Sequence, residues 1–257
     1  MEIEGRRVLL TGATGGLGTA IAEDLAERGA SLVLSGRRTA ELDALASRLG
    51  GDVLTADLAD PEGLDALCDA AAEVDIVVAN AGIGSDVSVE ASSAEDIDSV
   101  IDVNLRGPIH LSTRFAQSLI EQYRTGSVVF IGSLSGLAAS PNTRMYNATK
   151  FGLRGFALSL REDLSPFGIG VSIVEPGFIR EAGMFAASGM ELPPGVRTKT
   201  APDVARGVAE AILENRAEVF VAPVELRLAA TVATVAPTLS AWVQRRAGAA
   251  EITAERG

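Results

Sequence analysis

A tyrosine and a lysine stand four residues apart in the segment YNATK, residues 146–150. The chain contains only two tyrosines and two lysines, so the pairing of Tyr146 with Lys150 would be a rare coincidence without a function. On a helix, residues four apart project from one face, with their Cβ atoms about 5–6 Å apart. A buried ammonium beside a phenol stabilises the phenolate, and a side chain whose ordinary pKa is near 10 needs that help to exchange protons near neutrality. The pair therefore predicts a tyrosine that acts as a general acid or base, and the alternative is a solvated surface pair.

Apolar runs of strand length alternate with helical stretches along the whole chain. They are continuous and not alternating in polarity, as expected for strands with helices on both faces of the sheet. We therefore predict an α/β protein with a Rossmann-like, doubly wound parallel sheet flanked by helices, in a single domain over residues 1–257. The runs lie in RRVLLTG, ASLVLSG, GDVLTAD, VDIVVANAG, GSVVFIGS, GIGVSIVEPG and EVFVAP.

Several of the helical stretches begin at a capping residue or end at a glycine, as helices commonly do. Asp60 is the expected cap before Pro61, and Thr200 opens a capping-box pattern with Asp203. Helices are expected over 16–28, 39–49, 60–73, 94–123 with an interruption near Gly107-Pro108, 145–164 and 200–213, with a helical tail at 226–257.

The first strand leads directly into TGATGGLG, residues 11–18, and then into a helix. Glycines let the backbone turn sharply there and approach a ligand without interference from a Cβ atom. The helix that follows offers unpaired N–H groups and the positive end of its dipole, which suits a pyrophosphate. The alternative is a tight turn without a ligand, and the position after the first strand of a βαβ array disfavours it.

Taken together, these motifs resemble those of the short-chain dehydrogenase/reductase family. The turn reads T-G-x-x-x-G-x-G, and ADLAD, ANAG, VNLRG, IGSLSG and YNATK follow at fitting positions, with Ser133 thirteen residues before Tyr146. The resemblance covers roughly residues 5–222. It implies hydride transfer between a nicotinamide dinucleotide and a carbonyl or carbinol carbon, with the catalytic residues Asn104, Ser133, Tyr146 and Lys150.

The resemblance also implies a role for each of these side chains. Tyr146 would donate or accept the proton of the substrate oxygen, and Ser133 would hydrogen-bond that oxygen. Lys150 would hold the nicotinamide ribose and lower the pKa of the phenol, while Asn104 would position water for a proton relay. The cofactor would contact Gly12, Thr14, Gly15, Gly16, Leu17, Gly18, Arg37, Arg38, Asp57, Leu58, Asn80, Ala81, Gly82, Tyr146, Lys150, Pro176, Gly177 and Ile179.

The end of the second strand distinguishes the two nicotinamide cofactors. A ribose 2′-hydroxyl is typically held by an acidic residue about 20 residues beyond the glycines. This chain has Gly36 there, followed by Arg37 and Arg38. A carboxylate would repel a 2′-phosphate, whereas a guanidinium pairs with it. NADP(H) is therefore expected in preference to NAD(H), which stays possible; the alternative is that both arginines only solvate a loop.

The segment 178–200 is expected to form a lid over the substrate. Family members often carry a threonine a few residues past the proline and glycine, where this chain has Arg180 and Glu181. The lid's large apolar residues either line a pocket for a hydrophobic alcohol or ketone or serve as plain packing: Phe178, Met184, Phe185, Met190 and Leu192.

The tail carries an uncharged run at 228–243 that is too short, and too broken by Pro237, to span a bilayer. Packing within the chain or in a homodimer or homotetramer is favoured over peripheral membrane contact. A net charge of −12 argues against nucleic-acid binding. One cysteine, one histidine without companion ligands and no signal-peptide pattern indicate a metal-free, cytoplasmic protein.

Two other functions are weighed against this prediction. A dinucleotide-binding sensor or scaffold of the same fold would be expected to have lost one of the four catalytic residues, and all four are present. A sugar-nucleotide epimerase or dehydratase is disfavoured because the glycine spacing differs and the C-terminal part is too short for a nucleotide-sugar domain.

Overall fold

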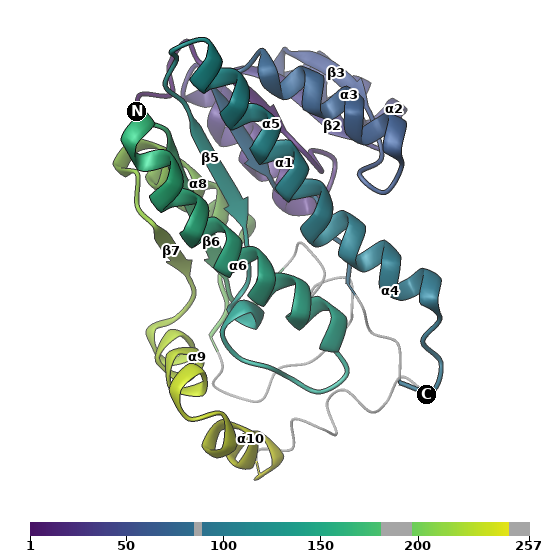
Figure 1. Ribbon diagram of the computed structural model, residues 1–257, viewed down its shortest axis with the longest axis vertical. Helices are drawn as coiled ribbons and strands as arrows, with labels where there is room; N and C mark the ends of the chain where they lie inside the picture. Colours follow the sequence, from purple (N-terminus) through teal and green to yellow (C-terminus); the bar gives the residue numbers. More distant parts are fainter. Residues whose placement is uncertain (85–88, 181–196, 247–257) are drawn as a thin grey trace.

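Seven parallel strands form one sheet within residues 1–84, 89–180 and 197–246, the part of the chain that the computed structural model describes (Figure 1). β4, β5 and β6 are buried at every position, so their continuous apolar sequences are explained by burial on both faces. The predicted fold class is confirmed. The strands are β1 (Arg7–Leu10), β2 (Ser31–Gly36), β3 (Asp52–Thr55), β4 (Ile76–Ala79), β5 (Ser127–Ile131), β6 (Gly170–Pro176) and β7 (Glu218–Val221).

The strand order is β3-β2-β1-β4-β5-β6-β7. The chain builds outward from β1 to β3 and then crosses back, so that β4 pairs with the other side of β1. Val8 is accordingly in register with Leu32 of β2 and with Ile76 of β4. In open parallel sheets, ligands bind outside the carboxyl ends of the strands at such a reversal. The topology therefore predicts a ligand-binding site at the loops after β1 and β4.

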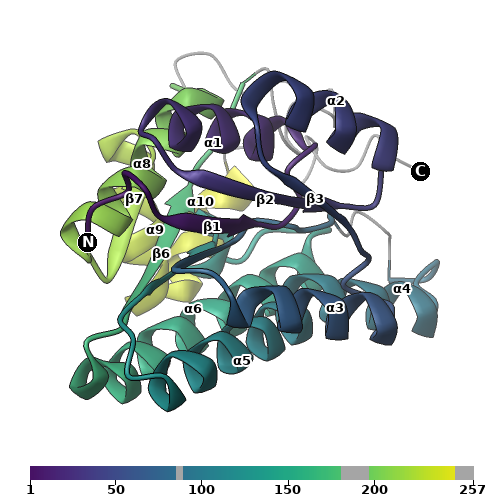
Figure 2. The same cartoon turned by 90° about the horizontal axis from the view of Figure 1, so that it is seen from above.

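Helices cover both faces of the sheet and enclose two apolar cores (Figure 2). Ile21, Leu42 and Val208 belong to one core, and Leu67 and Phe115 belong to the other. On the first face lie α1 (Gly16–Glu27), α2 (Thr39–Leu49) and α8 (Ala201–Glu214); on the second lie α3 (Pro61–Ala72), α5 (Gly107–Glu121) and α6 (Arg144–Leu164).

Local capping fixes where several helices begin and end. Asp60 accepts a hydrogen bond from the Gly63 N–H at 2.9 Å at the start of α3. Thr200 and Asp203 form the predicted capping box of α8. Gly29, after α1, has φ +81°, a conformation that side chains other than glycine rarely adopt. These signals act within a few residues, which is why the sequence reveals them.

The long helix before β5 is widened, and the widening differs in place from the expected interruption near Gly107-Pro108. α4 (Ala94–Ile101) runs into a π-helical turn (Asp102–Arg106) and then into α5 without a break in direction (Figure 1). In the wide turn, the Gly107 N–H donates to the Asp102 carbonyl, five residues back. Pro108 has no N–H to donate to the Asn104 carbonyl, as a regular α-helix would require. The helix accommodates the missing hydrogen bond by widening in the turn before the proline.

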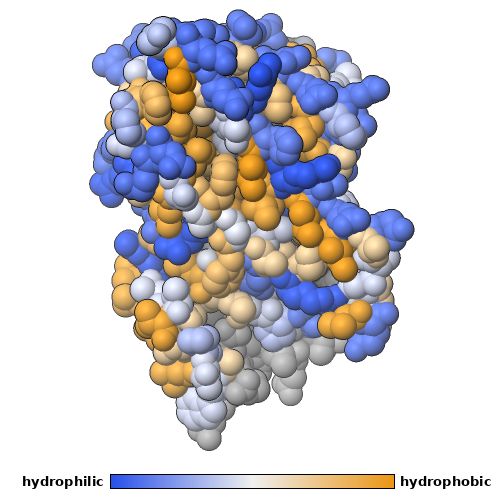
Figure 3. Space-filling view, viewed as in Figure 1, coloured by the Kyte–Doolittle hydropathy of each residue, from blue (hydrophilic) through white to orange (hydrophobic). Residues whose placement is uncertain are grey.

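The last two helices, α9 (Val224–Val235) and α10 (Pro237–Arg246), lie below the sheet in Figure 1, and Ala236 separates the end of α9 from the start of α10. Thr234 donates to the Leu137 carbonyl at 3.3 Å, so α9 contacts the loop after β5. In the described part of the chain, no helix combines the length and apolar character needed to cross a membrane. Figure 3 shows apolar side chains gathered over both helices; those exposed are Val224, Leu228, Val232, Val235, Leu239 and Trp242.

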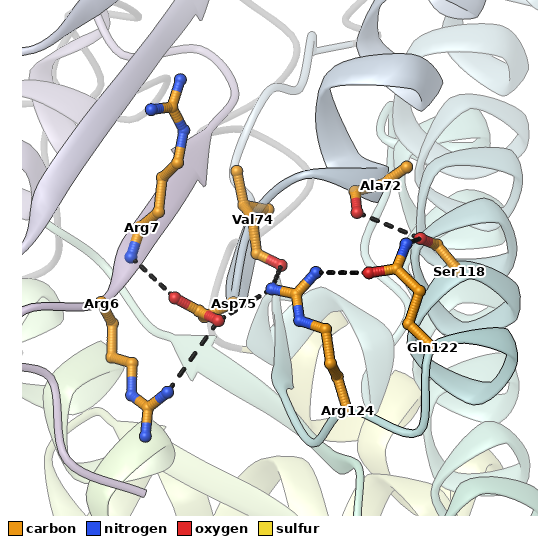
Figure 4. A network of polar contacts seen from close by, with 8 residues as sticks. All are labelled: Arg6, Arg7, Ala72, Val74, Asp75, Ser118, Gln122 and Arg124. Atoms are coloured by element: carbon orange, nitrogen blue, oxygen red, sulfur yellow. Dashed lines mark hydrogen bonds and ion pairs between the residues drawn. The ribbon is translucent and has the colours of Figure 1, made fainter.

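A polar network ties the amino ends of β1, β4 and β5 together, at the edge opposite the loops after β1 and β4 (Figure 4). Asp75 accepts from the Arg7 N–H at 3.1 Å and from Arg124 Nη2 at 2.9 Å, and Arg6 lies 3.9 Å away. Ser118 and Gln122 extend the network along α5. The Asp75 carboxylate thus links the starts of β1 and β4 to the loop before β5.

Substitution Asp75→Ala is expected to lower the free energy of unfolding by about 1–2 kcal/mol, because it leaves the Arg7 N–H without its acceptor and removes the carboxylate partner of Arg124, whose Nη2 keeps the Val74 carbonyl. Chemical denaturation measures this change. The matched control is Glu23→Ala, which removes an exposed pair with Arg48 and should change stability by at most about 0.5 kcal/mol. Equal effects in the two variants would contradict the role of Asp75.

Candidate active site

The loops after β1 and β4 brace each other through Thr11 and Asn80. Thr11 Oγ1 accepts from the backbone N–H groups of Asn80 and Ala81, both at 3.1 Å. The Asn80 side chain donates back to the carbonyls of Thr11 and Gly12 at 3.0 and 3.1 Å. A Cβ at Gly12, whose φ is +65°, would lie 2.8 Å from Ala81 Cα. Only glycine therefore permits this close approach.

The rest of the glycine turn leaves the start of α1 open. A side chain at Gly18 would collide with the Gly12 carbonyl, whereas Gly15 and Gly16 are exposed. No side chain caps α1, and its first turn carries no acidic residue. The first N–H groups of the helix and its positive dipole end are therefore available to an anion. These features fit the pyrophosphate of a dinucleotide.

Arg37 and Arg38 follow the end of β2, beside the glycine turn. Arg38 Nη2 donates to the Thr14 carbonyl at 2.8 Å and to Thr14 Oγ1 at 3.1 Å. The Arg37 guanidinium is 67% exposed and lies 3.8 Å from Asp57. The predicted residues Arg37, Arg38, Asp57 and Thr14 are thus together. Leu58 and Ile179 are instead buried among core side chains, so only their backbones could face a ligand.

Asn104 lies in the π-helical turn and is fully buried. Its Oδ1 accepts from the Ile83 N–H at 2.8 Å, and its Nδ2 donates to the Ile83 carbonyl at 2.8 Å. Nδ2 also donates to Thr149 Oγ1 at 3.3 Å. The side chain thus joins the loop after β4 to α6, and its polar atoms already have protein partners. A water contact would need the Asn104 carbonyl, which Pro108 leaves without an α-helical donor.

Lys150 is buried at 3% exposure between three elements. Its Nζ donates to the carbonyl of Ile131, the last residue of β5, at 2.7 Å. A Cβ added at Gly82 would lie 3.8 Å from Nζ and 3.3 Å from Asn104 Oδ1. The ammonium lies 5.6 Å from the centroid of the Tyr146 ring, on the same face of α6. The predicted pairing in space is therefore present.

Ser133 follows β5 and hydrogen-bonds Tyr146 through its side chain. Its Oγ also accepts from the Ser135 N–H at 3.1 Å, which begins a 3-10 turn (Leu134–Gly136). A Cβ at Gly177 would lie 3.4 Å from Leu134 Cδ1, so the end of β6 borders the same loop. Among the described residues, no group of three or more His, Cys, Asp or Glu side chains could hold a metal ion.

Loss of water dominates the electrostatics of the pair. Burial raises the pKa of Tyr146 to about 12, while the Ser133 hydrogen bond lowers it and the Glu175 charge raises it. Burial lowers the pKa of Lys150 to about 8, and Glu175 opposes that change. The expectation that Lys150 makes the phenol acidic is therefore not met in the protein alone. Its ammonium is bound to a carbonyl and does not offset desolvation of the phenol.

Asn147 is a supporting residue that the sequence analysis overlooked. It is 5% exposed, and its Nδ2 donates to the carbonyls of Ser135 and Ala138 at 2.8 and 3.0 Å. Its Oδ1 accepts from Thr143 Oγ1 at 2.5 Å and from the Ser140 N–H at 3.3 Å. One amide therefore holds the loop between Ser133 and Tyr146 to the first turns of α6. Its only sequence signal is its place inside YNATK.

Comparison with known proteins gives concordant matches. The sequence pattern described as short chain dehydrogenase matches residues 6–191. The 3-oxoacyl-[acyl-carrier-protein] reductase of Rickettsia conorii is 36% identical over 182 residues, which cover 70% of this chain and 75% of that protein. The short-chain dehydrogenase of Sphingobium yanoikuyae in complex with NADPH has a TM-score of 0.78 and 28% identity, covering 96% of this chain and 95% of that one. The 3-ketoacyl-(acyl-carrier-protein) reductase of Brucella melitensis complexed with NADH has a TM-score of 0.77 and 26% identity, covering 85% and 97%.

Substitution Asn147→Ala is expected to lower the free energy of unfolding by about 1–3 kcal/mol, because it leaves several buried polar groups of the loop without partners. Turnover should fall as well, since the spacing between Ser133 and Tyr146 is no longer fixed. Thermal unfolding and kcat measure the two effects. Gln117→Ala, which truncates an exposed amide on α5, is the control and should leave both unchanged. A stable Asn147→Ala variant with full activity would contradict this role.

Proposed function

This chain belongs to the short-chain dehydrogenase/reductase family and is an oxidoreductase that acts on CH–OH or carbonyl groups with NAD(P), and we propose that it prefers NADP(H) and a hydrophobic ketone or secondary alcohol. The observation that carries the proposal for the site is the gathering of Ser133, Tyr146 and Lys150 next to the braced loops after β1 and β4.

A bound nicotinamide dinucleotide supplies or accepts the hydride. The chain's own residues manage the proton and the oxygen. Tyr146 is the group that gives a proton to the carbonyl oxygen in reduction and takes it back in oxidation. Ser133, already hydrogen-bonded to that phenol, is positioned to hold the same oxygen. General acid–base catalysis of this kind contributes about 10²–10⁴-fold to a rate.

Lys150 serves in this proposal as a cation and as a hydrogen-bond donor. One of its protons is used by the Ile131 carbonyl, and an ammonium has three to donate, so it can also bind a ribose hydroxyl. Because burial holds the pKa of Tyr146 high, the protein alone favours the protonated acid, which suits carbonyl reduction. The positive charge of an oxidised nicotinamide would favour the phenolate in the reverse direction.

The preference for NADP(H) is supported by the two arginines after β2. Gly36 has no carboxylate to repel a 2′-phosphate, and the Arg37 guanidinium is mostly exposed, 3.8 Å from Asp57. Arg38 is already bound to Thr14 and Glu41, so Arg37 is the freer phosphate ligand of the two. Related structures contain NADPH in one case and NADH in another, and family membership alone does not decide the cofactor.

A β-bridge joins Ile179 to Lys199, so the ends of the proposed lid at 178–200 lie together. Met184, Phe185, Met190, Leu192 and Glu181 lie outside the described residues. The relatives that reduce 3-oxoacyl groups support a carbonyl substrate with an apolar chain. The exposed apolar side chains of α9 and α10 support association into a homodimer or homotetramer in preference to peripheral membrane contact.

Substitution Tyr146→Phe is expected to lower kcat by about 10²–10⁴-fold while the Kd for NADPH stays largely unchanged, because the phenol moves the proton and does not hold the dinucleotide phosphates. Turnover is measured on an aryl ketone, an aliphatic ketone and a 3-oxoacyl thioester. The control is Tyr123→Phe, which alters the other tyrosine, 97% exposed, and should be fully active. Parallel loss of binding and turnover in Tyr146→Phe would contradict the role of Tyr146. If the unaltered protein bound NADPH but turned over no carbonyl, and Tyr146→Phe had no effect, the sensor would be favoured.

Substitution Arg37→Ala is expected to raise the Kd for NADPH about tenfold or more, and to leave that for NADH nearly unchanged, because a charge-assisted hydrogen bond to the 2′-phosphate is lost. Fluorescence titration with both cofactors gives the ratio. Arg48→Ala is the matched control, since it removes an arginine at the far end of α2 that is paired with Glu23. An unchanged ratio for Arg37→Ala would refute the phosphate assignment.

A further inference from the structure

Glu175 is a fully buried carboxyl group beside the catalytic residues, and the roles assigned above do not use it. It stands near the end of β6, next to β5 in the sheet. Its Oε2 accepts from the Ser133 N–H at 2.5 Å. A Cβ added at Gly132 would collide with Oε2, so glycine at that position makes room for the carboxyl. The backbone at Ser133 is therefore held by a carboxyl group from the neighbouring strand.

The second oxygen of this carboxyl is poorly compensated. Among the described residues, Oε1 accepts no hydrogen bond, and Arg154 Nε lies 4.0 Å away. Arg154 is committed to Glu218, with Nε–Oε1 at 2.6 Å and Nη2–Oε2 at 3.2 Å. A buried carboxylate with so few partners is costly, and burial accordingly raises the pKa of Glu175 to about 8.

The charged and titratable groups that face Glu175 come from two elements packed against it. From α6 come Lys150, Tyr146 and Arg154, and from β7 comes Glu218. The negative charge of Glu175 raises the pKa of Lys150, because it favours the ammonium. The same charge raises the pKa of Tyr146, because it disfavours the phenolate. Both effects favour the protonated forms of Lys150 and Tyr146.

We propose that Glu175 is a positioning residue of the reaction: its carboxyl fixes the backbone of Ser133, and its charge keeps Tyr146 and Lys150 protonated in alkaline solution. The inference rests on the proposed function of Tyr146 and Lys150 and extends it to a residue of β6. Glu175 touches neither substrate nor reacting atoms in this assignment. It acts through the two groups that do.

The charge of Glu175 affects carbonyl reduction only in alkaline solution. Below about pH 8 the Glu175 carboxyl is mostly neutral, and removal of its charge changes little. Above that pH it is ionised, and carbonyl reduction needs both the Tyr146 phenol and the Lys150 ammonium in their protonated forms. Without the carboxylate both groups lose their protons at lower pH. The alkaline loss of activity must then begin earlier.

The test compares Glu175→Gln with Glu175→Leu in the pH profile of kcat/KM, from about pH 6 to about pH 10, for NADPH-dependent reduction of the best ketone from the Tyr146 panel. Glutamine keeps an acceptor for the Ser133 N–H and removes the charge. Its profile should match that of the unaltered protein at low pH, with the alkaline limb about one pH unit lower. Leucine also removes the acceptor and should lower kcat/KM at every pH.

A second readout needs no substrate. In a Tyr123→Phe background Tyr146 is the only tyrosine, so tyrosinate absorbance in the near ultraviolet reports its titration alone. Glu175→Gln should move that midpoint to lower pH by about one unit. Glu218→Gln is the matched control, since it removes a carboxylate from the same arginine and frees Arg154 for Glu175; its midpoint should stay or move upward.

Profiles and midpoints of Glu175→Gln that superimpose on those of the unaltered protein would overturn the proposal. A uniform loss of kcat/KM with no displacement of the alkaline limb would also overturn it, because that outcome assigns Glu175 a purely structural role. If Tyr146→Phe were fully active, the proposed function would fail instead, whatever the Glu175 variants show. The two failures are therefore distinguishable.

Discussion

One buried ammonium, that of Lys150, sets what the surrounding elements must provide. A cation removed from water needs hydrogen-bond partners and nearby negative charge. β5 provides the Ile131 carbonyl, β6 provides the carboxyl of Glu175, and the loop after β4 has a glycine at position 82, where a Cβ would lie 3.8 Å from the ammonium and 3.3 Å from Asn104 Oδ1. Each of three neighbouring strands supplies one part at its carboxyl end. The order β4-β5-β6 in the sheet is therefore a requirement of the site as much as of the core.

The same group shows why charge and distance alone are a poor guide to proton affinity. Sequence spacing correctly implies that Lys150 and Tyr146 share a helix face, and the 5.6 Å separation agrees with it. It does not tell how much water each group loses, and burial raises the pKa of Tyr146 to about 12 in the protein alone. Alcohol oxidation near neutral pH, which needs the phenolate, would therefore draw on the positive charge of an oxidised nicotinamide in addition to that of Lys150.

Features encoded over a few residues were predictable, and those encoded across strands were not. Continuous apolar runs revealed the strands, and the Asp60 and Thr200 caps revealed the helix starts, because each acts within one turn. The interruption expected near Gly107-Pro108 takes the form of a π-helical turn at Asp102–Arg106, because the missing proline N–H is accommodated in the turn before the proline. Asn147 and Glu175 were overlooked, since their partners other than Thr143 lie 7 to 42 residues away. Glu175 did leave one trace, as the only charged residue in GIGVSIVEPG.

The contact between Gly132 and Glu175 makes these two positions interdependent in evolution and in engineering. A methyl group at 132 can enter only if the side chain at 175 becomes shorter or turns away, and a shorter side chain gives up the Ser133 N–H. Substitutions at the two sites are therefore non-additive, with a double replacement less damaging than the sum of its parts. Homologous chains are expected to exchange the residues at positions 132 and 175 jointly. Covariation between these two positions, more than identity at either one, should therefore identify the relatives that keep this carboxyl.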